Sequence, residues 1–565
     1  MPKRRRMNIL GINSVFHESS AALIIDGEVV AACEEERFNR IKHGKLAQVD
    51  NPQVLPEAAI RFCLDYAGLQ AREINHVAYS FDPEIRRTDF RADWRPDLGL
   101  EMEFLQCLDE VGDAAERVLE RELDRALRFV PHHLAHAASA YYPSGFDAAA
   151  ILILDGIGEA ACSTLARGDG TRIEPIETFS YPHSLGFIWE LVSFHLGFSP
   201  YDASKVMGLA AYGDPDIFSR QFASIIRVGE DDYAVDPAAL GLPSLAPKGL
   251  EALLGPAREA KSEILPRHMN IAAALQAATN AAVGALLRRL ERSARLKRLC
   301  VAGGVALNCV TNALIRQVSG FSDIFIPSAP HDAGTAIGAA LAVHCSERGR
   351  SPPPSDANPY LGPQFDEREV LAAVKASGLT PRRSKDAARE AADMIADGNI
   401  VGWFQGRMEF GPRALGNRSL LADPRRPDMR AILNSRIKHR EDFRPFAPSV
   451  LAERADEWFE VGPHLASHEY MLFACPTRAG RRDRIPAVIH HDGTARVQLV
   501  RHEANPRFHD LISCFFLRTG VPLVLNTSFN DSEPIVCTPA HAIATFRSTA
   551  IDALFMGEIC LTSRA

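Results

Sequence analysis

Apolar and polar positions follow the same order in two separate stretches of the chain. In residues 7–37, apolar runs predict three strands, and Asp26-Gly27 between the second and third is a two-residue hairpin signal. Residues 148–179 repeat this order, with an apolar run, a Gly-rich turn, a second run, the turn Gly168-Asp169-Gly170 and a third run. Two copies of one strand meander predict a duplicated α/β domain with a cleft between its halves.

Helical spacing of apolar residues predicts helices over residues 54–67, 111–128 and 270–295. Further strands are expected at 399–405 and 521–526. The stretch SPPPSDANPYLGP, which begins at Ser351, has the prolines and polar residues of a linker. We therefore expect a first α/β domain in residues 1–350, a linker in 351–365 and a second α/β domain in 366–565.

The composition and net charge indicate which classes of protein the chain can belong to. Hydrophobic residues make up 46% and charged residues 24% of the chain, as in soluble globular proteins, and the formal charge of −8 gives no overall basic surface for nucleic acid. No apolar run approaches the roughly 18 residues that span a membrane. The start MPKRRRM lacks the apolar segment of a signal peptide, and we interpret it as a solvated tail or an overlong start before Met7. The 11 cysteines include no CxxC pair, which predicts reduced thiols in a cytoplasmic protein.

Three glycine-bearing turns of the first domain each follow an apolar strand. They are Asp155–Glu159, Gly303–Asn308 and Asp332–Gly338. Glycine lets the backbone approach a ligand, and a helix opening behind a turn offers N–H groups to an anion. Three such turns around a duplicated meander favour a nucleotide in the cleft over three unrelated tight turns. Asp155 suits a magnesium-facing or phosphate-facing role, with a helix N-cap as the alternative.

The segment HHLAHAASAYY places His132 and His136 four residues apart. On a helix they share one face, as two imidazoles must to bind one metal ion, although core or capping histidines give the same spacing. Asp332 is the candidate carboxylate that would complete a facial iron or manganese site. His133 points elsewhere and receives no role.

The second domain contains a strongly basic segment. Residues 407–444 hold ten Arg or Lys and five Asp or Glu, among them Lys438, Arg440 and Arg444. Arg413 and Arg418 lie on a Gly/Pro-shaped loop where the guanidinium fork suits phosphate. Ser528 follows an apolar strand. The alternative, a solvated basic helix face, would have these arginines interleaved with Glu four residues away.

Seven motifs over nearly the whole chain resemble those of the NodU/CmcH carbamoyltransferases, which modify nodulation factors and antibiotics. The motifs are FHESSAALIIDGEVVAACEEERFNRIKH, HHLAHAASAYYPSGF, SKVMGLAAYG, VAGGVALN, GPRALGNRSLLADPR, FRPFAPSV and LNTSFN. The resemblance implies a TsaD-like, actin/hexokinase-like (ASKHA) duplicated first domain and a YrdC-like second domain. It also implies an ATP-dependent O-carbamoyltransferase that forms carbamoyl adenylate in the second domain and carbamoylates a hydroxyl in the first.

The resemblance also implies site residues. His132, His136 and Asp332 are the expected Fe(2+) ligands, and His17 is the expected base on the acceptor hydroxyl. Nucleotide contacts, for ATP with Mg(2+) or the adenylate, are expected from Lys42, Asp155, Gly156, Lys205, Gly303, Gly304 and Asn308. The carbamoyl phosphate and ATP site is expected at Arg413, Lys438, Arg444, Arg496 and Ser528, and Arg418 joins them from the basic loop.

Two other functions fit parts of the pattern. A small-molecule kinase of the ASKHA type would share the three turns but leaves the basic second domain unexplained. A tRNA-modifying threonylcarbamoyl enzyme is opposed by the acidic net charge and by the fusion of both domains in one chain. We expect a small-molecule hydroxyl acceptor, no membrane or nucleic acid partner, and a monomer or homodimer. Residues 212–270 depart from the family pattern and are expected to face the acceptor.

Overall fold

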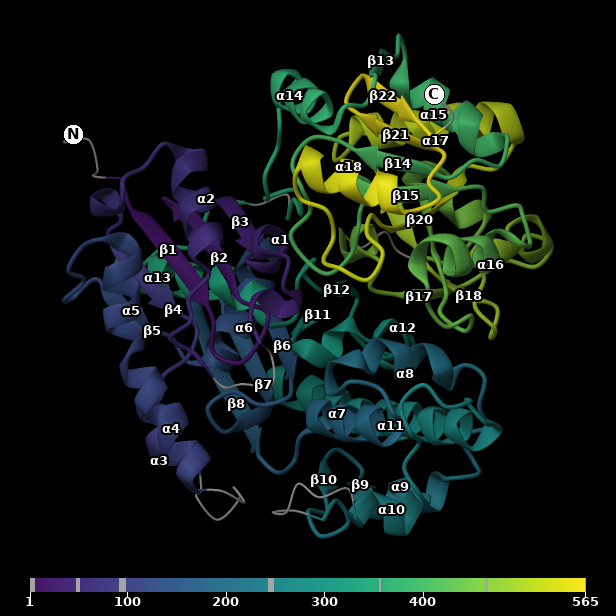
Figure 1. The fold of residues 1–565 in the computed structure, drawn as a ribbon. Coiled ribbons are helices and arrows are strands. Elements are labelled where there is room, and N and C mark those ends of the chain that lie inside the picture. The colour runs from purple at the N-terminus through teal and green to yellow at the C-terminus, as the bar shows by residue number, and fades with distance from the viewer. Residues whose placement is uncertain are drawn as a thin grey trace. The chain divides into compact units, whose positions relative to one another are not determined.

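The computed structural model describes residues 6–46, 51–90, 98–241, 248–354, 357–462 and 466–563. The chain forms two compact units (Figure 1). The first runs to Glu35 and continues from His43 to Ala357, and the second comprises Glu36–Lys42 and Asn358–Ala565. The main division falls within the expected linker, but residues 36–42, which were expected in the first domain, belong to the second unit.

The first unit begins with a five-stranded sheet in the order β3-β2-β1-β4-β5. Its strands are β1 (Asn8–Asn13), β2 (Ser20–Ile25), β3 (Glu28–Glu34), β4 (His76–Tyr79) and β5 (Leu127–Phe129). β1 pairs antiparallel with β2 and parallel with β4, which pairs parallel with β5. The β2–β3 hairpin turns at Asp26 and Gly27, both with positive φ (52° and 94°), as the two-residue turn signal predicts.

A second sheet repeats this arrangement. Its strands are β6 (Ala148–Leu154), β7 (Ala161–Asp169), β8 (Arg172–Ser180), β11 (Arg298–Ala302) and β12 (Asp323–Phe325), in the order β8-β7-β6-β11-β12. β6 is antiparallel to β7 and parallel to β11, and β11 is parallel to β12, so each pairing matches its counterpart in the first sheet. The expected duplicated α/β fold of the ASKHA type is therefore confirmed for this unit.

Two helices occupy equivalent positions in the two halves. α6 (His132–Tyr141) follows β5, and α13 (Thr335–Arg348) follows β12. They pack closely, because a Cβ added to Gly338 on α13 would lie 1.8 Å from the carbonyl oxygen of Ala135 on α6. The predicted metal ligands sit at the N-terminal ends of these two helices.

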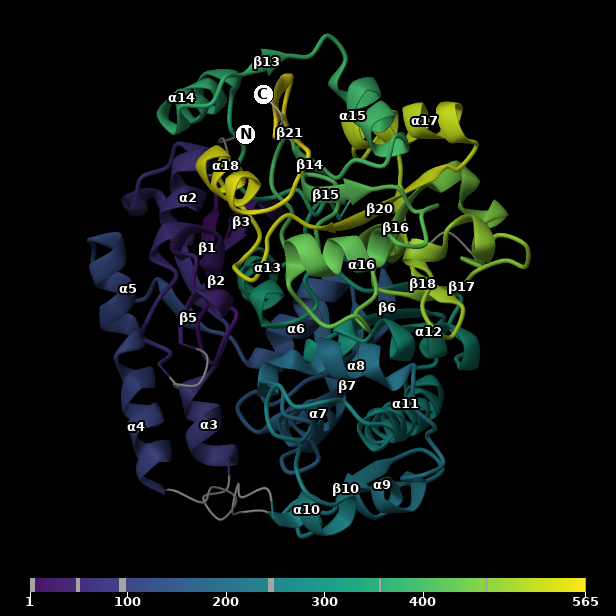
Figure 2. The ribbon, with the colours of Figure 1, turned by 45° about the vertical axis from the view of Figure 1, so that its right-hand side comes forward.

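The remaining helices of this unit surround the sheets and their insertions. They include α2 (Glu57–Ala67), α3 (Pro83–Asp89), α4 (Leu98–Asp109), α5 (Val111–Leu119), α7 (Leu185–His195), α8 (Ala203–Ala210), α9 (Ser219–Ile225), α10 (Lys248–Leu254), α11 (Pro266–Ala294) and α12 (Cys309–Val318). Helices α7, α8 and α11 gather beside the second sheet, near the small hairpin of β9 (Ile226–Val228) and β10 (Tyr233–Val235) (Figures 1 and 2).

Two sequence expectations need correction here. The helix predicted over 111–128 ends at Leu119, because Glu120 adopts a left-handed conformation (φ 51°) and residues 127–129 form β5. Contrary to the expectation that no segment is long and apolar enough to cross a membrane, α11 meets that criterion by length and composition. Most of its apolar window is buried, as in the core helix of a globular protein.

The second unit contains a mixed eight-stranded sheet in the order β13-β22-β21-β14-β15-β20-β16-β19. Its strands are β13 (Arg382–Arg383), β14 (Val401–Phe404), β15 (Arg418–Ala422), β16 (Ala447–Leu451), β19 (Gln498–Val500), β20 (Leu523–Ser528), β21 (Ala553–Met556) and β22 (Ile559–Thr562). β17 (Ala474–Pro476) and β18 (Thr494–Arg496) form a separate pair. The strands expected at 399–405 and 521–526 are thus found as β14 and β20.

Five helices of the second unit flank this sheet. They are α14 (Glu367–Ser377), α15 (Ala387–Ala396), α16 (Met429–Leu433), α17 (Pro506–Thr519) and α18 (Pro539–Ser548). α15 packs beside α17, and α14 beside α18 (Figure 2). The YrdC-like character of this unit stays a prediction.

Residues 36–42 are held in the second unit by side chains of the short helix α1 (Glu36–Asn39) and of Arg40. Arg37 donates to the carbonyl of Gly411 at 2.9 Å, and Arg40 donates to that of Ile535 at 2.7 Å. Phe38 packs against the buried cluster Met408, Ile535 and Cys537. These contacts make α1 an integral part of the second unit.

Candidate metal centre and active site

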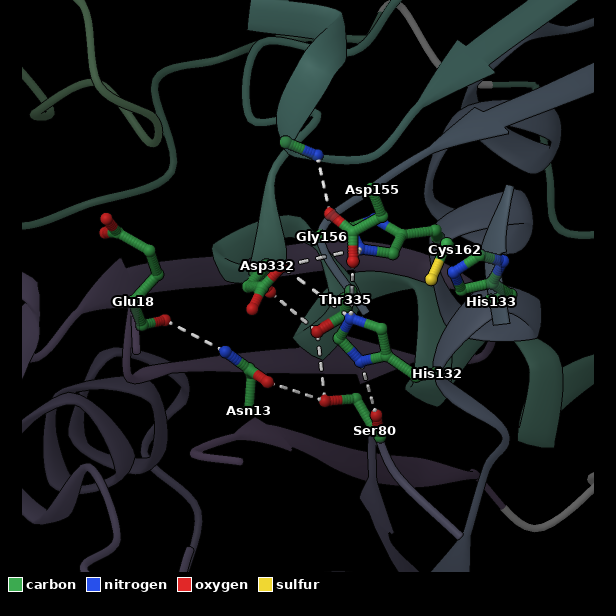
Figure 3. A network of polar contacts seen from close by, with 12 residues as sticks. Asn13, Glu18, Ser80, His132, His133, Asp155, Gly156, Cys162, Asp332 and Thr335 are labelled. Atoms are coloured by element: carbon green, nitrogen blue, oxygen red, sulfur yellow. Dashed lines mark hydrogen bonds and ion pairs between the residues drawn. The ribbon is translucent and has the colours of Figure 1, made fainter. Parts of the chain in front are cut away.

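Four side chains of the first unit converge on one point. His132 and His136 lie one turn apart on α6. Asp155 follows the last residue of β6, Asp332 precedes α13, and Figure 3 shows both beside His132. Each offers one ligand atom, and these atoms all lie within 4.8 Å of one another. Three of the four were expected from the sequence as metal ligands, whereas Asp155 was expected at the nucleotide.

The distances within this group suit a cation at its centre. His132 Nε2 lies 3.4 Å from Asp155 Oδ2 and 3.6 Å from Asp332 Oδ1, and the corresponding distances from His136 Nε2 are 3.7 and 3.5 Å. All four side chains are buried, and neither Nε2 atom has a hydrogen-bond partner among the described residues. Two buried carboxylates facing two imidazoles are unfavourable unless a cation neutralises them, so the donor set fits a divalent transition metal.

Further contacts orient these ligands. His132 Nδ1 donates to the carbonyl of Ser80 at 3.0 Å, which leaves the lone pair on Nε2 directed at the centre (Figure 3). The backbone N–H of Gly304 donates to Asp155 Oδ1 at 2.8 Å, so that Oδ2 faces the imidazoles. Metal ligands commonly make such hydrogen bonds through the atoms that do not face the metal.

Charges within the site shift the pKa values of its acidic groups. Burial alone would raise the pKa of the Asp155 carboxyl, but His136 and His132 hold it well below its usual range. Burial, together with the charges of Asp155 and Asp332, raises the pKa of Glu190 on α7 to about 8. Glu190 lies beside the Gly156 turn, since a Cβ at Gly156 would be 3.6 Å from its Oε1. Nothing in the sequence around Glu190 marks it as a site residue.

The three glycine-bearing turns meet at one edge of the second sheet, because β6, β11 and β12 are neighbouring parallel strands. Gly303 has φ 95°, and a Cβ there would lie 2.2 Å from the Leu154 carbonyl oxygen, so only glycine fits. Asn308 is the N-cap of α12, accepting from Val310 N and Thr311 N, and it also donates to Gln276. Its side chain therefore has a structural use.

The other predicted residues of the first domain are more scattered. His17 lies on the β1–β2 loop, with its ring 5.1 Å from that of Tyr201 and its Nδ1 4.0 Å from Glu18 Oε1. Lys205 forms an ion pair with Asp202 at 2.9 Å. Lys42 is exposed and falls in the segment that belongs to the second unit, which the sequence analysis had placed in the first domain.

In the second unit, Lys438 is buried and makes contacts with two residues of the β20 end. Its Nζ lies 3.3 Å from Ser528 Oγ and donates to Asn530 Oδ1 at 2.7 Å. Burial and the neighbouring charges of Arg440 and Arg444 depress the pKa of the Lys438 amine well below its usual value. Burial, Arg444 and Arg496 lower the pKa of Arg440 to about 9. These contacts and charges link Lys438 with Arg440, Arg444, Arg496 and Ser528, and the role of this group in binding carbamoyl phosphate and ATP stays a prediction.

Arg418 does not make the phosphate contact expected from the sequence. Its five N–H groups all point at backbone carbonyl oxygens, those of Gln405, Asn417, Pro363, Gly406 and Cys537. It is buried, with its guanidinium carbon 3.7 Å from the centre of the Phe404 ring. The expected phosphate contact is therefore wrong for this residue, whose donors serve the fold. Arg413 lies on the loop that leads into β15.

Comparison with known proteins decides the family. Residues 8–341 match the family model described as Carbamoyltransferase N-terminus, and residues 392–563 match Carbamoyltransferase C-terminus. The chain belongs to the NodU-type carbamoyltransferase family. It is accordingly a carbamoyltransferase, and the family resemblance expected from the sequence motifs is confirmed.

Relatives of this carbamoyltransferase include nodulation proteins. It is 38% identical to Nodulation protein NolNO of Sinorhizobium fredii, over 98% of this chain and 80% of the relative. It is 40% identical to Nodulation protein NolO of Bradyrhizobium diazoefficiens, over 77% of this chain and 79% of the relative.

Solved structures match with little sequence identity. T. kodakarensis HypF aligns with 61% of this chain and 48% of its own at 14% identity, with a TM-score of 0.33. A Thermus thermophilus ROK hexokinase aligns with 60% of this chain and 98% of its own at 13% identity, with a TM-score of 0.28. Both TM-scores are low, and the fold assignment of the carbamoyltransferase rests on the strand order of its two sheets.

Proposed function

We propose that the protein is an ATP-dependent O-carbamoyltransferase that works in two steps, one in each unit. In the second unit, carbamoyl phosphate, ATP and water give carbamoyl adenylate, inorganic phosphate and pyrophosphate. In the first unit, the carbamoyl group is transferred to a hydroxyl of a small natural product. We further propose that the enzyme acts in the cytoplasm.

The observation that carries the first step is the cationic cluster Lys438, Arg440, Arg444 and Arg496. Buried cations repel one another and lose hydration, which is why the pKa values of Lys438 and Arg440 are depressed. A bound polyanion would relieve both penalties, and the guanidinium fork suits phosphate oxygens. Carbamoyl phosphate and the triphosphate of ATP, with its Mg(2+), are the anions that a carbamoyl-activating enzyme requires.

For the second step, the acceptor oxygen forms a bond to the carbamoyl carbon while the bond from that carbon to the AMP phosphate oxygen breaks. AMP leaves with the electron pair, and we assign the hydroxyl proton to His17. A divalent metal, which we propose to be Fe(2+), would be held by His132, His136, Asp155 and Asp332 and would supply a Lewis acid to a phosphate or carbamoyl oxygen. Gly156, Gly303 and Gly304 would border the adenylate through their backbone.

The test is exchange of labelled pyrophosphate into ATP, which should depend on carbamoyl phosphate. Arg444→Ala should lower this exchange at least about 10²-fold because a charged contact to phosphate is lost. Arg454→Ala is the matched control, since Arg454 forms an exposed ion pair with Glu457 at 2.8 Å and should leave exchange unchanged. Formation of ADP and a phosphorylated small molecule, or exchange without carbamoyl phosphate, would contradict the proposal.

A further inference from the structure

A second polar cluster of the first unit surrounds Glu18, on the β1–β2 loop. Its Oε1 lies 2.6 Å from Nδ1 of His43, and its Oε2 lies 3.7 Å from Nε2 of His331. Nδ1 of His17 approaches the same Oε1 at 4.0 Å. One carboxylate therefore faces three imidazoles, which come from the β1–β2 loop, from the segment after α1 and from the loop before α13.

The backbone around this carboxylate is held in an uncommon conformation. Glu18 and His43 both have left-handed φ values, 58° and 67°, which side chains other than glycine rarely adopt. The Ser19 N–H donates to the His43 carbonyl at 3.0 Å, so the two strained residues are tied to each other. Such conformations persist where surrounding contacts enforce them, and they concentrate at functional sites.

A hydrogen-bond network connects the Glu18 loop to the metal centre (Figure 3). Asn13 Nδ2 donates to the carbonyls of His17 and Glu18 at 3.2 and 3.0 Å. Asn13 Oδ1 accepts from Ser80 Oγ at 2.9 Å, and the Ser80 carbonyl accepts from His132 Nδ1. Asn13, which positions the loop, is thus hydrogen-bonded to Ser80, which orients a metal ligand.

The Glu18 carboxylate is charged at neutral pH. Burial alone would raise its pKa, but hydrogen bonds to His331 and His43 and the charges of both rings hold the pKa well below its usual range. A charged carboxylate beside an imidazole fixes the ring and stabilises the imidazolium that forms when the ring accepts a proton.

We infer that Glu18 is the positioning carboxylate of the transfer step. It holds His43 through the 2.6 Å contact and lies beside His17, to which the proton of the acceptor hydroxyl passes as the hydroxyl oxygen attacks the carbamoyl carbon. This inference rests on the proposed function, because it assigns Glu18 to the second of the two proposed steps. A carboxylate that only joined two loops would need neither the three imidazoles nor two left-handed residues. The Glu18–His43–His17 group then acts as one unit in proton uptake.

The experiment uses water as the acceptor, with ATP and carbamoyl phosphate as substrates, and measures AMP release between pH 5 and 9. In Glu18→Gln the rate of AMP release at pH 7 should fall about 10²-fold, within the range of general-base effects. The acid limb of the pH profile should move to lower pH, because a neutral amide at position 18 no longer favours a protonated His43 ring. The titratable groups that face this site are His17, His43, His331 and Tyr201.

Hydroxylamine separates a role in proton transfer from a structural role. Its nitrogen attacks the carbamoyl carbon without prior loss of a proton, the bond to AMP breaks, and hydroxyurea forms. Glu18→Gln should keep hydroxyurea formation near that of the unchanged protein. Glu18→Asn, whose side chain tolerates the left-handed conformation, provides a second variant if the first folds poorly. Glu57→Gln, on the exposed face of α2, is the matched control.

Three outcomes would overturn the inference. The first is unchanged AMP release and an unchanged pH profile in Glu18→Gln. The second is an equal loss of AMP release and hydroxyurea formation in that variant. The third is a second metal ion that the unchanged protein binds and Glu18→Gln loses, which would make the cluster a metal site. The proposed function fails separately, if the unchanged protein shows no exchange that depends on carbamoyl phosphate. If Glu18→Gln keeps both the exchange and the AMP release with water as the acceptor, only the role of Glu18 is contradicted.

Discussion

His132 and His133 are neighbours on α6, yet their imidazoles have different partners. His132 Nε2 faces the two carboxylates of the metal centre, whereas His133 Nδ1 contacts Thr164 Oγ1 at 2.7 Å. We predict about one metal ion per chain, as expected for a single mixed imidazole–carboxylate site, with loss of that ion in His132→Ala and retention in His133→Ala. Elemental analysis of the purified variants measures this, and equal loss in both would contradict the assigned centre.

Arg418 supports a prediction about stability. Its removal takes a donor from five carbonyl groups, of which those of Asn417 and Pro363 still accept from the backbone N–H groups of Gln405 and Met408. Arg418→Ala should therefore lower the free energy of unfolding of the second unit by about 3–5 kcal/mol. Arg418→Lys should recover little, because three ammonium donors cannot replace a five-donor fork. Denaturant unfolding checks this, and Arg413→Ala is the comparison. A raised KM for carbamoyl phosphate with unchanged stability would instead favour the phosphate contact expected from sequence.

These residues also show where sequence reasoning stops. The i, i+4 spacing of His132 and His136 is visible in the sequence because helix geometry is local. The partners of Arg418 come from five other positions between Pro363 and Cys537, and no local pattern distinguishes them from a phosphate. Asp155 was found as a residue at a strand end, but its place beside Asp332 depends on the neighbouring positions of β6, β11 and β12.

At the scale of elements, the close approach of α6 and α13 sets the geometry of the metal centre. Gly338→Ala would place a Cβ 1.8 Å from the Ala135 carbonyl oxygen, so the helices must separate. We predict a lower melting temperature and weaker metal binding in this variant. Gly284→Ala on α11 is the control, because its Cβ meets only Arg288 Nη1 at 3.6 Å and alanine favours a helix. Unaltered metal affinity in Gly338→Ala would argue against this dependence.

The strand meanders were predictable because each is a local pattern of apolar runs and turn signals, repeated in the chain. The prediction of a helix over 111–128 was wrong beyond Leu119. The apolar spacing continues past Glu120, but there the backbone is left-handed, and the chain goes on to form β5. Periodicity locates the body of an element more reliably than its end, since the end depends on what packs next to it.

At the scale of the whole molecule, the chain passes from one unit to the other at three places, after Glu35, Lys42 and Ala357. A fragment of residues 358–565 therefore lacks α1, with the Arg37–Gly411 and Arg40–Ile535 contacts and the packing of Phe38. We predict that this fragment is less stable than the same unit in the full chain, and that adding a peptide of residues 36–42 raises its melting temperature. A peptide with Phe38 replaced by Ala is the control, and equal effects of both peptides would contradict the prediction.

The position of α1 has a consequence for biosynthesis. Its residues leave the ribosome long before their partners, because Arg37 and Arg40 bond to residues 374 and 495 positions later. The nascent first unit can form its sheets before α1 meets its partners, and the contacts of α1 are complete only after Ile535 has been translated. The contacts of the second unit therefore form late. In a chain that stops before residue 535, Phe38 stays exposed as an apolar residue that chaperones or proteases can bind.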